Sequence, residues 1–159
     1  MRDQAIYNLY PQVRTIIDGI TCLDSAGVKV VIDEALITPE LANLVFAAAR
    51  VNKLKYINAE ADKRFEVMLA PYPQYEVNTW SNQYAEAKAL KLDPLAYTPT
   101  LTALALYYGV AVSILAQGVL TKAAAYTTAS GEIIGRRKKL TDQLGAATTV
   151  TQIEAVIWI

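Results

Sequence analysis

Residues 38–69 have the sequence TPELANLVFAAARVNKLKYINAEADKRFEVML, and this stretch decides the fold. Its first three residues favour a helix start. Thr38 can cap the first turn, Pro39 suits the first helical position, and Glu40 complements the helix dipole. No further proline follows until Pro71. The sequence therefore predicts one helix of about 30 residues, which would be about 45 Å long.

Apolar residues recur along this stretch at alternating spacings of three and four, as in the a and d positions of a coiled coil. A helix of this length exceeds the depth of a small globular core, so we expect it to pair with another long helix. We therefore predict that copies of the chain associate through this seam, with Leu44, Val51, Leu54, Phe65 and Met68 as contact residues. The complete seam consists of Leu44, Ala47, Val51, Leu54, Asn58, Ala61, Phe65 and Met68.

The residues after Pro71 also have helical signals. A helix is expected around residues 80–92, and a second one is expected to begin at Pro99 and end near Gly109. The last helix is predicted to be long, with a kink or a close helix contact near Gly131. The ring of Trp158 is expected to pack back onto the bundle. The seam of the last helix consists of Val112, Ala116, Val119, Ala123, Tyr126, Ser130, Ile133, Arg137, Leu140, Leu144 and Ala147.

The first 38 residues differ from the rest of the chain. Residues 13–18 and 28–32 are rich in β-branched side chains, and the loop between them contains the turn sequence of residues 24–27. Two such runs predict a β-hairpin, in a unit of two or three strands that is too small to be stable alone. The apolar and aromatic residues 5–11 precede it and end at a proline.

These patterns predict an α+β fold that is mostly α. We expect a small β-rich head (residues 1–38), a long coiled-coil-like connecting helix (residues 39–70) and an α-helical C-terminal bundle (residues 71–159).

The composition argues against catalysis. The chain has no histidine, which excludes Ser-His-Asp and Cys-His nucleophiles and imidazole-based zinc sites. Its one cysteine, Cys22, is predicted to lie in the hairpin loop without a nearby base. We expect a non-enzymatic protein with no catalytic residue, no cofactor and no metal ion. The lack of an apolar leader near the N-terminus predicts a cytoplasmic location.

The charges argue against nucleic acid as a partner. Fifteen basic residues balance fifteen acidic residues, so the formal net charge is zero. Phosphate binding is driven by a basic surplus, which this chain lacks. The basic run at residues 136–139 is interpreted as a solvated helix face, with a small anion patch as the alternative.

One segment raises the question of a membrane span. The 28 residues from 94 to 121 include no charged side chain, and a run of 18 or more is the usual criterion. However, Pro99 and Gly109 divide this segment, and it contains several threonines and tyrosines. We therefore predict two short buried helices and no membrane partner. A small membrane-active protein remains an alternative.

Tyrosine is abundant, with ten residues in the chain. Tyrosine gives a large amphipathic contact area at low entropic cost and is enriched at protein interfaces, although edge-of-core packing would also account for it. The N-terminal tyrosines belong to a β unit that needs something to cover it. We predict a partner-binding surface there, formed by Tyr7, Tyr10, Pro11, Val30 and Ile32.

A series of landmark residues suggests a family. The C-terminal part of the chain resembles an uncharacterised domain found in tail proteins and tail fibre assembly chaperones of tailed bacteriophages. The opening of the chain, residues 5–11, is similar to small phage proteins encoded beside tail fibre genes. The C-terminal landmarks are Trp80, Glu86, Asp93, Thr98, Pro99, Thr100, Leu101, Gly109, Lys122, Tyr126, Gly131, Ile134, Gly135, Arg136, Arg137, Leu140, Ala147, Thr148, Thr149 and Trp158.

This resemblance implies an α+β chaperone whose partner is a phage tail fibre protein. Such a chaperone would bind the receptor-binding end of the fibre in the host cytoplasm, help it to fold or trimerise, and in some cases stay on the virion. The resemblance supplies no catalytic residue. A purely structural baseplate or tail subunit remains the alternative.

Overall fold

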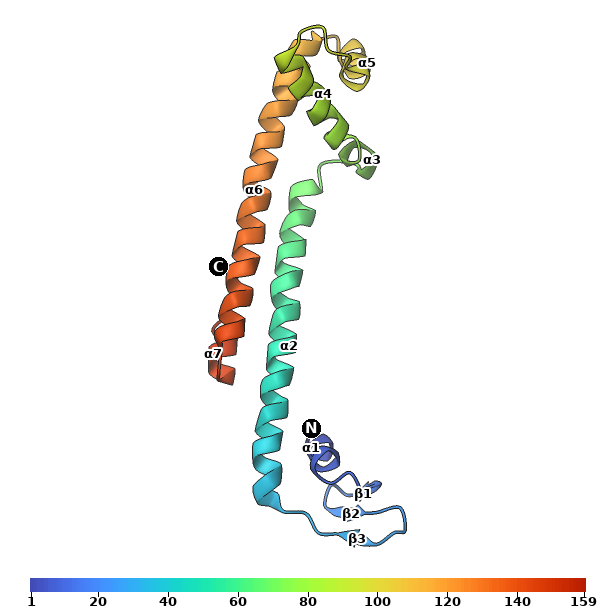
Figure 1. Ribbon diagram of the computed structural model, residues 1–159, viewed down its shortest axis with the longest axis vertical. Coiled ribbons are helices and arrows are strands. Elements are labelled where there is room, and N and C mark those ends of the chain that lie inside the picture. Colours follow the sequence, from blue (N-terminus) through green and yellow to red (C-terminus); the bar gives the residue numbers. More distant parts are fainter. The chain divides into compact units, whose positions relative to one another are not determined.

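The computed structural model describes residues 1–159. Helices account for most of the chain, and a three-stranded antiparallel sheet lies near its N-terminus (Figure 1). This arrangement confirms the predicted α+β, mostly helical fold. The elements in chain order are α1 (Arg2–Leu9), β1 (Thr15–Ile17), β2 (Thr21–Leu23), β3 (Lys29–Val30), α2 (Glu34–Leu69), α3 (Gln74–Val77), α4 (Trp80–Leu92), α5 (Pro99–Tyr108), α6 (Val112–Ala146) and α7 (Val150–Glu154).

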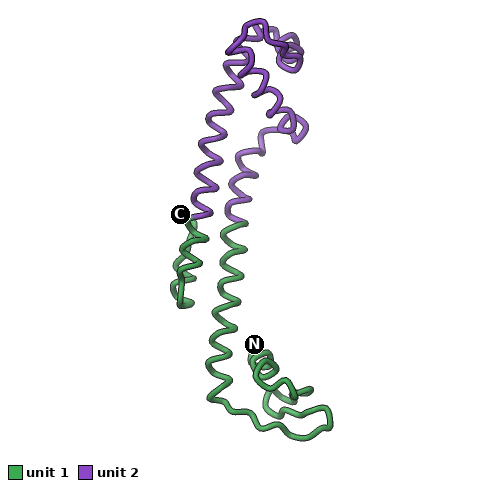
Figure 2. Tube along the Cα trace, viewed as in Figure 1, with its two compact units in different colours: residues 1–58, 139–159 green, residues 59–138 purple.

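The chain forms two compact units (Figure 2). Unit 1 contains residues 1–58 and 139–159, and unit 2 contains residues 59–138. The long helices α2 and α6 each contribute one part to each unit. The expected segment limits at residues 38 and 70 lie near the two ends of α2.

The sheet in unit 1 has the order β1-β2-β3. Ile16 pairs with Cys22, and Cys22 pairs with Val30, so these three side chains form one row across the sheet. We call residues 1–38 the head, and this row packs on the core of the head. Alternate rows of a sheet face opposite sides, so the rows on either side of this one face away from that core.

The predicted hairpin between residues 13–18 and 28–32 is wrong in its pairing. Residues 21–23, which were expected to lie in a loop, form the middle strand, and Cys22 is buried there. Two tight turns make this possible, because Gly19 and Gly27 both adopt positive φ. The Oδ1 atom of Asp24 completes the second turn by accepting hydrogen bonds from the amides of residues 26 and 28.

The expectation of a head that is mainly β is also corrected, because residues 2–9 form the helix α1. Ala5 and Ile6 are the buried residues of α1, and they pack with Ile37 of α2 in the head core. A polar contact also joins α1 to α2: the Asn8 side-chain amide donates a hydrogen bond of 2.8 Å to the Glu40 carboxylate. The apolar residues at the start of the chain therefore cover the sheet as a helix.

The helix α2 begins one turn earlier than predicted. Thr38 and Pro39 lie inside the helix, and Asp33 supplies the cap, with its Oδ1 atom accepting from the Ala35 amide at 2.9 Å. Proline lacks the amide that would bond to the carbonyl four residues earlier. The burial of Ile37 in the head core favours the extra turn despite this missing bond.

The second core of unit 1 confirms the C-terminal part of the predicted seam of the last helix. Leu140, Leu144 and Ala147 are buried against Ile57 of α2, together with Ile153 and Val156 near the C-terminus. Trp158 packs against the same cluster, as expected. The helix α7 begins with a capping box, in which Thr149 and Gln152 satisfy each other's backbone amides.

Unit 2 contains the short helices and the first part of α6. Pro99 occupies the first turn of α5, and Gly109 ends that helix in the left-handed conformation, as predicted. Ala87, Leu101 and Ala116 form the buried cluster of unit 2. Of the kink or close helix contact predicted near Gly131, the close contact is absent at Gly131 itself, because a Cβ atom added there would meet nothing within 4 Å.

Candidate interaction surfaces

The head presents an apolar outer surface. Ile17 pairs with Thr21 in an outward-facing row, and one further step of the β2–β3 register places Val31 beside Thr21. Val31 is 83% exposed, and Ile20, in the turn after β1, is also exposed. We call Ile17, Ile20 and Val31 the outer head surface. The sequence analysis did not predict these three residues as a surface. The alternation of side chains along a strand does indicate that Val31 faces the opposite side from Val30 and Ile32.

The predicted partner-binding residues of the head are divided between its core and its surface. Tyr10, Val30 and Ile32 are partly buried and pack on the head core. The hydroxyl of Tyr10 also accepts the Asp33 amide at 2.9 Å, which joins the end of α1 to the start of α2. Tyr7 and Pro11 are exposed to solvent. These last two are therefore the most accessible of the five residues.

The predicted association seam on α2 is covered at some positions and open at others. Leu44 packs on the head core, and Phe65 and Met68 are partly buried. Val51 and Leu54 are exposed, at 54% and 39%. These two open positions are where a second copy could contact the helix.

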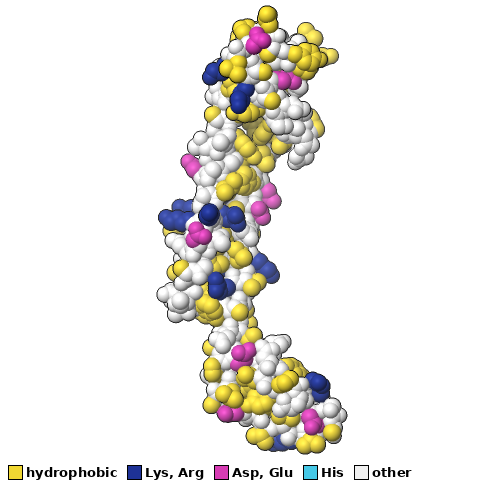
Figure 3. Space-filling model, viewed as in Figure 1, with side chains coloured by type: hydrophobic (Ala, Val, Ile, Leu, Met, Phe, Trp, Pro, Cys, Tyr) yellow, Lys and Arg dark blue, Asp and Glu magenta, His cyan; other side chains and the backbone are white.

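A group of exposed apolar side chains lies at the end of unit 2 that contains the α4–α5 and α5–α6 connections, where Figure 3 shows hydrophobic side chains projecting. Tyr107 and Leu95 are each 92% exposed. The expectation of two buried helices is therefore wrong for much of this segment. Only Leu101 and Ala105 of α5 are buried. We name the group the apolar tip: Leu92, Leu95, Tyr97, Leu106, Tyr107, Tyr108, Val110 and Ile114.

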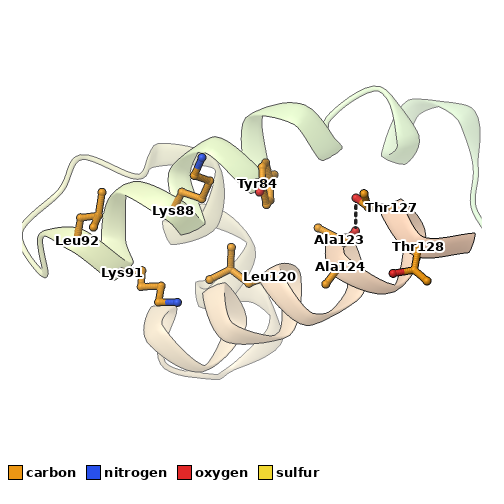
Figure 4. A pocket seen from close by; sticks show the side chains of 9 residues that line it. All are labelled: Tyr84, Lys88, Lys91, Leu92, Leu120, Ala123, Ala124, Thr127 and Thr128. Atoms are coloured by element: carbon orange, nitrogen blue, oxygen red, sulfur yellow. Dashed lines mark hydrogen bonds between the residues drawn. The ribbon is translucent and has the colours of Figure 1, made fainter. Parts of the chain in front are cut away.

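An open groove lies beside the apolar tip, between α4 and α6 (Figure 4). One wall is formed by α4 residues spaced at i, i+4, i+7 and i+8, and the other by a leucine and four small side chains of α6. The lining includes two lysines and no acidic residue. The groove residues are Tyr84, Lys88, Lys91 and Leu92 on α4, and Leu120, Ala123, Ala124, Thr127 and Thr128 on α6.

Titratable side chains do not gather into a metal centre, since no group of three His, Cys, Asp or Glu residues is placed to hold an ion. No single helix is long and apolar enough to cross a membrane. The helices α5 and α6 meet the length and hydropathy criterion only as a pair, with a bend of 107° between them.

Comparison with known protein families gives a match to a short part of the chain. A family model described as the HI1402 helical domain matches residues 121–158, which is less than half of the chain. The matched segment contains most of α6, all of α7 and Trp158. Neither a curated protein nor a solved structure matches the chain.

Proposed function

We propose that this chain is a non-enzymatic assembly protein of a tailed bacteriophage that binds the tail fibre protein as a chaperone. The observation that carries this proposal is the outer head surface, which exposes apolar side chains although the head has a core of its own. Exposed apolar surface beyond scattered single residues marks interaction sites. The resemblance to tail fibre assembly chaperones supplies the identity of the partner.

The proposed mechanism is binding alone. The outer head surface would cover apolar surface of an immature fibre segment and so prevent its aggregation, and Tyr7 would add an exposed aromatic contact from α1 of the head. The open seam positions on α2 would bring copies of the chaperone together. The complex would form in the host cytoplasm, and the chaperone would either leave or stay as a fibre subunit of the virion.

Co-expression with the product of the adjacent fibre gene tests this function. We expect soluble, trimeric fibre only when this chain is present, measured by yield and by size exclusion with light scattering. Persistent co-elution would indicate a subunit that stays on the fibre. Fibre yield that does not depend on the chain would contradict the chaperone function. Fixed stoichiometry with other virion proteins would then support a structural baseplate or tail subunit.

The head contact predicts a specific loss of binding. The double variant Tyr7→Ala, Val31→Ser should weaken co-elution with the fibre by about tenfold, because apolar anchors dominate interface energies. Both side chains are exposed, so helicity measured by circular dichroism should not change. The control is Val67→Ser, which removes another exposed valine, 68% accessible, from α2. Unaltered co-elution of the double variant would exclude this surface as the contact.

The open seam predicts an oligomer that charge can disrupt. Val51→Glu together with Leu54→Glu should abolish oligomers. Association would bury two unpaired carboxylates of each copy against the seam of the second helix. Native mass from light scattering is the measurement. Val67→Glu, on the same helix but outside the seam, should leave the mass unchanged. An unchanged mass for the double variant would contradict association through α2.

A further inference from the structure

The apolar tip exposes more large apolar side chains than any packing need explains. Its members lie between Leu92 and Ile114, and the chain includes no charged residue from 94 to 121. The buried cluster of the same unit is complete without them, since Ala87, Leu101 and Ala116 are covered by other residues of α4 and α6. Water is therefore an unfavourable environment for this end of unit 2.

The distribution of these side chains around α5 indicates what kind of partner fits. Leu106, Tyr107 and Tyr108 are consecutive, and all three are more than 70% exposed. Successive residues of a helix are about 100° apart, so together they occupy more than half of its circumference. A protein groove binds one face of a helix, at positions such as i, i+3 and i+4. Apolar side chains on most of the circumference suit a fluid apolar medium that surrounds the helix end.

Cationic side chains lie next to the tip. Lys88 and Lys91 line the groove beside Leu92, and Lys122 is ten residues, or about 15 Å, beyond the start of α6. The two acids in this region are bonded to the backbone: Glu86 accepts the amides of residues 100 and 101, and Asp93 accepts the amide of Leu95. Both carboxylates keep their charge, but the three lysines outnumber them, so the net charge next to the tip is positive and complements an anionic surface.

We propose that the apolar tip inserts into the interfacial layer of an anionic lipid bilayer without crossing it. Because α5 and α6 meet at a bend of 107°, α5 could lie along the bilayer surface at the depth where α6 enters the lipid. The leucines and Ile114 would contact acyl chains. Tyr97, Tyr107 and Tyr108 would lie at the boundary, where amphipathic rings are favoured, and the lysines would contact headgroup phosphates. This inference is independent of the proposed fibre binding, and it replaces the expectation from the sequence that the chain has no membrane partner.

Vesicle flotation with the full chain tests the proposal. The protein should float with vesicles of phosphatidylglycerol and phosphatidylcholine, less with phosphatidylcholine alone, and less at high salt, because salt screens the lysines. Leu95→Ser with Leu106→Ser should lower the partition coefficient by about tenfold or more, since each leucine loses its transfer to the acyl layer. Lys91→Gln with Lys122→Gln should remove the preference for anionic vesicles.

Two controls make the result specific. Val31→Ser removes an exposed valine from the head and should leave flotation unchanged. Tyr107→Trp places a fluorophore at a highly exposed tip position, and its emission should shift to the blue with anionic vesicles.

Lack of flotation of the unmodified chain with either vesicle type would overturn the proposal. So would equal flotation of the two-serine variant. If that variant instead lost co-elution with the fibre protein and the chain bound no vesicles, the tip would be a protein interface. Failure of fibre binding with intact flotation would overturn the proposed function and leave this inference standing.

Discussion

Replacing Ile57 with alanine is expected to lower the free energy of unfolding of unit 1 by about 2–5 kcal/mol, the range for replacing a large aliphatic side chain by alanine in a packed core. Ile57 is fully buried, and its cluster brings α2 together with residues 140–156. These residues are more than eighty positions away in the sequence, so few local contacts can replace those that are lost. Chemical denaturation followed by Trp158 fluorescence measures the effect, because Trp158 packs against the same cluster.

The two tryptophans allow this measurement to be confined to unit 1. Trp80 lies in unit 2, between Tyr72 and Tyr126, so a Trp80→Phe background leaves Trp158 as the single reporter. Lys55→Ala provides an exposed control on the same helix and should change stability by less than about 0.5 kcal/mol. An Ile57→Ala variant that matches this control would show that the cluster does not hold the C-terminal residues on α2.

The helical part of the fold could be predicted because its signals are local. Pro99 has a fixed φ and Gly109 tolerates a positive one, so they define the ends of α5 wherever it packs. The seam of the last helix was also predictable, since a period near 3.6 places Leu140, Leu144 and Ala147 on one face. In both cases the residues themselves contain the information.

The head could not be predicted in the same way, because its elements depend on contacts that are distant in the sequence. The strand β2 has three residues and is too short for a periodic signal. Its position is fixed by pairing on both sides and by the burial of Cys22 under α1 and Ile37. The start of α2 shifted for a similar reason, since the burial of Ile37 outweighed the capping preference at Thr38.

The candidate surfaces show a second limit. A periodic pattern indicates which apolar residues share a face, but it does not indicate which face the rest of the chain leaves open. Val30 was selected for partner binding and packs inward, whereas the adjacent Val31 is exposed. Likewise, the uncharged segment after Asp93 was expected to be buried, yet Tyr107 and Tyr108 lie in solvent.

Several landmark residues of the phage-protein resemblance make contacts that hold the fold. Trp80 packs edge-on against Tyr72 and Tyr126, and Trp158 packs on the core of unit 1. Thr149 begins α7 with a capping box. These landmark residues therefore have structural roles in this chain. Among them, Glu86 provides the sharpest test.

Replacing Glu86 with alanine should lower the free energy of unfolding of unit 2 by about 1–3 kcal/mol. The first amides of a helix lack partners within it, and Thr98 gives α5 no side-chain cap. The Glu86 carboxylate accepts both the Thr100 amide, at 3.1 Å, and the Leu101 amide, at 2.8 Å. Without it, two donors would lose their partner, next to the fully buried Leu101. Hydrogen exchange of these two amides should accelerate, and Trp80 fluorescence should report the loss of stability.

The charge and the hydrogen bonds of Glu86 can be separated. Glu86→Gln keeps one acceptor oxygen, so its stability should lie between those of the alanine variant and the unmodified chain. Glu132→Ala removes an exposed acid from α6 in the same unit and is the matched control. If exchange at residues 100 and 101 did not change in the alanine variant, Glu86 would not be the cap of α5. A glutamine variant as stable as the unmodified chain would assign the effect to the hydrogen bonds alone, because the helix dipole would then gain nothing from the negative charge.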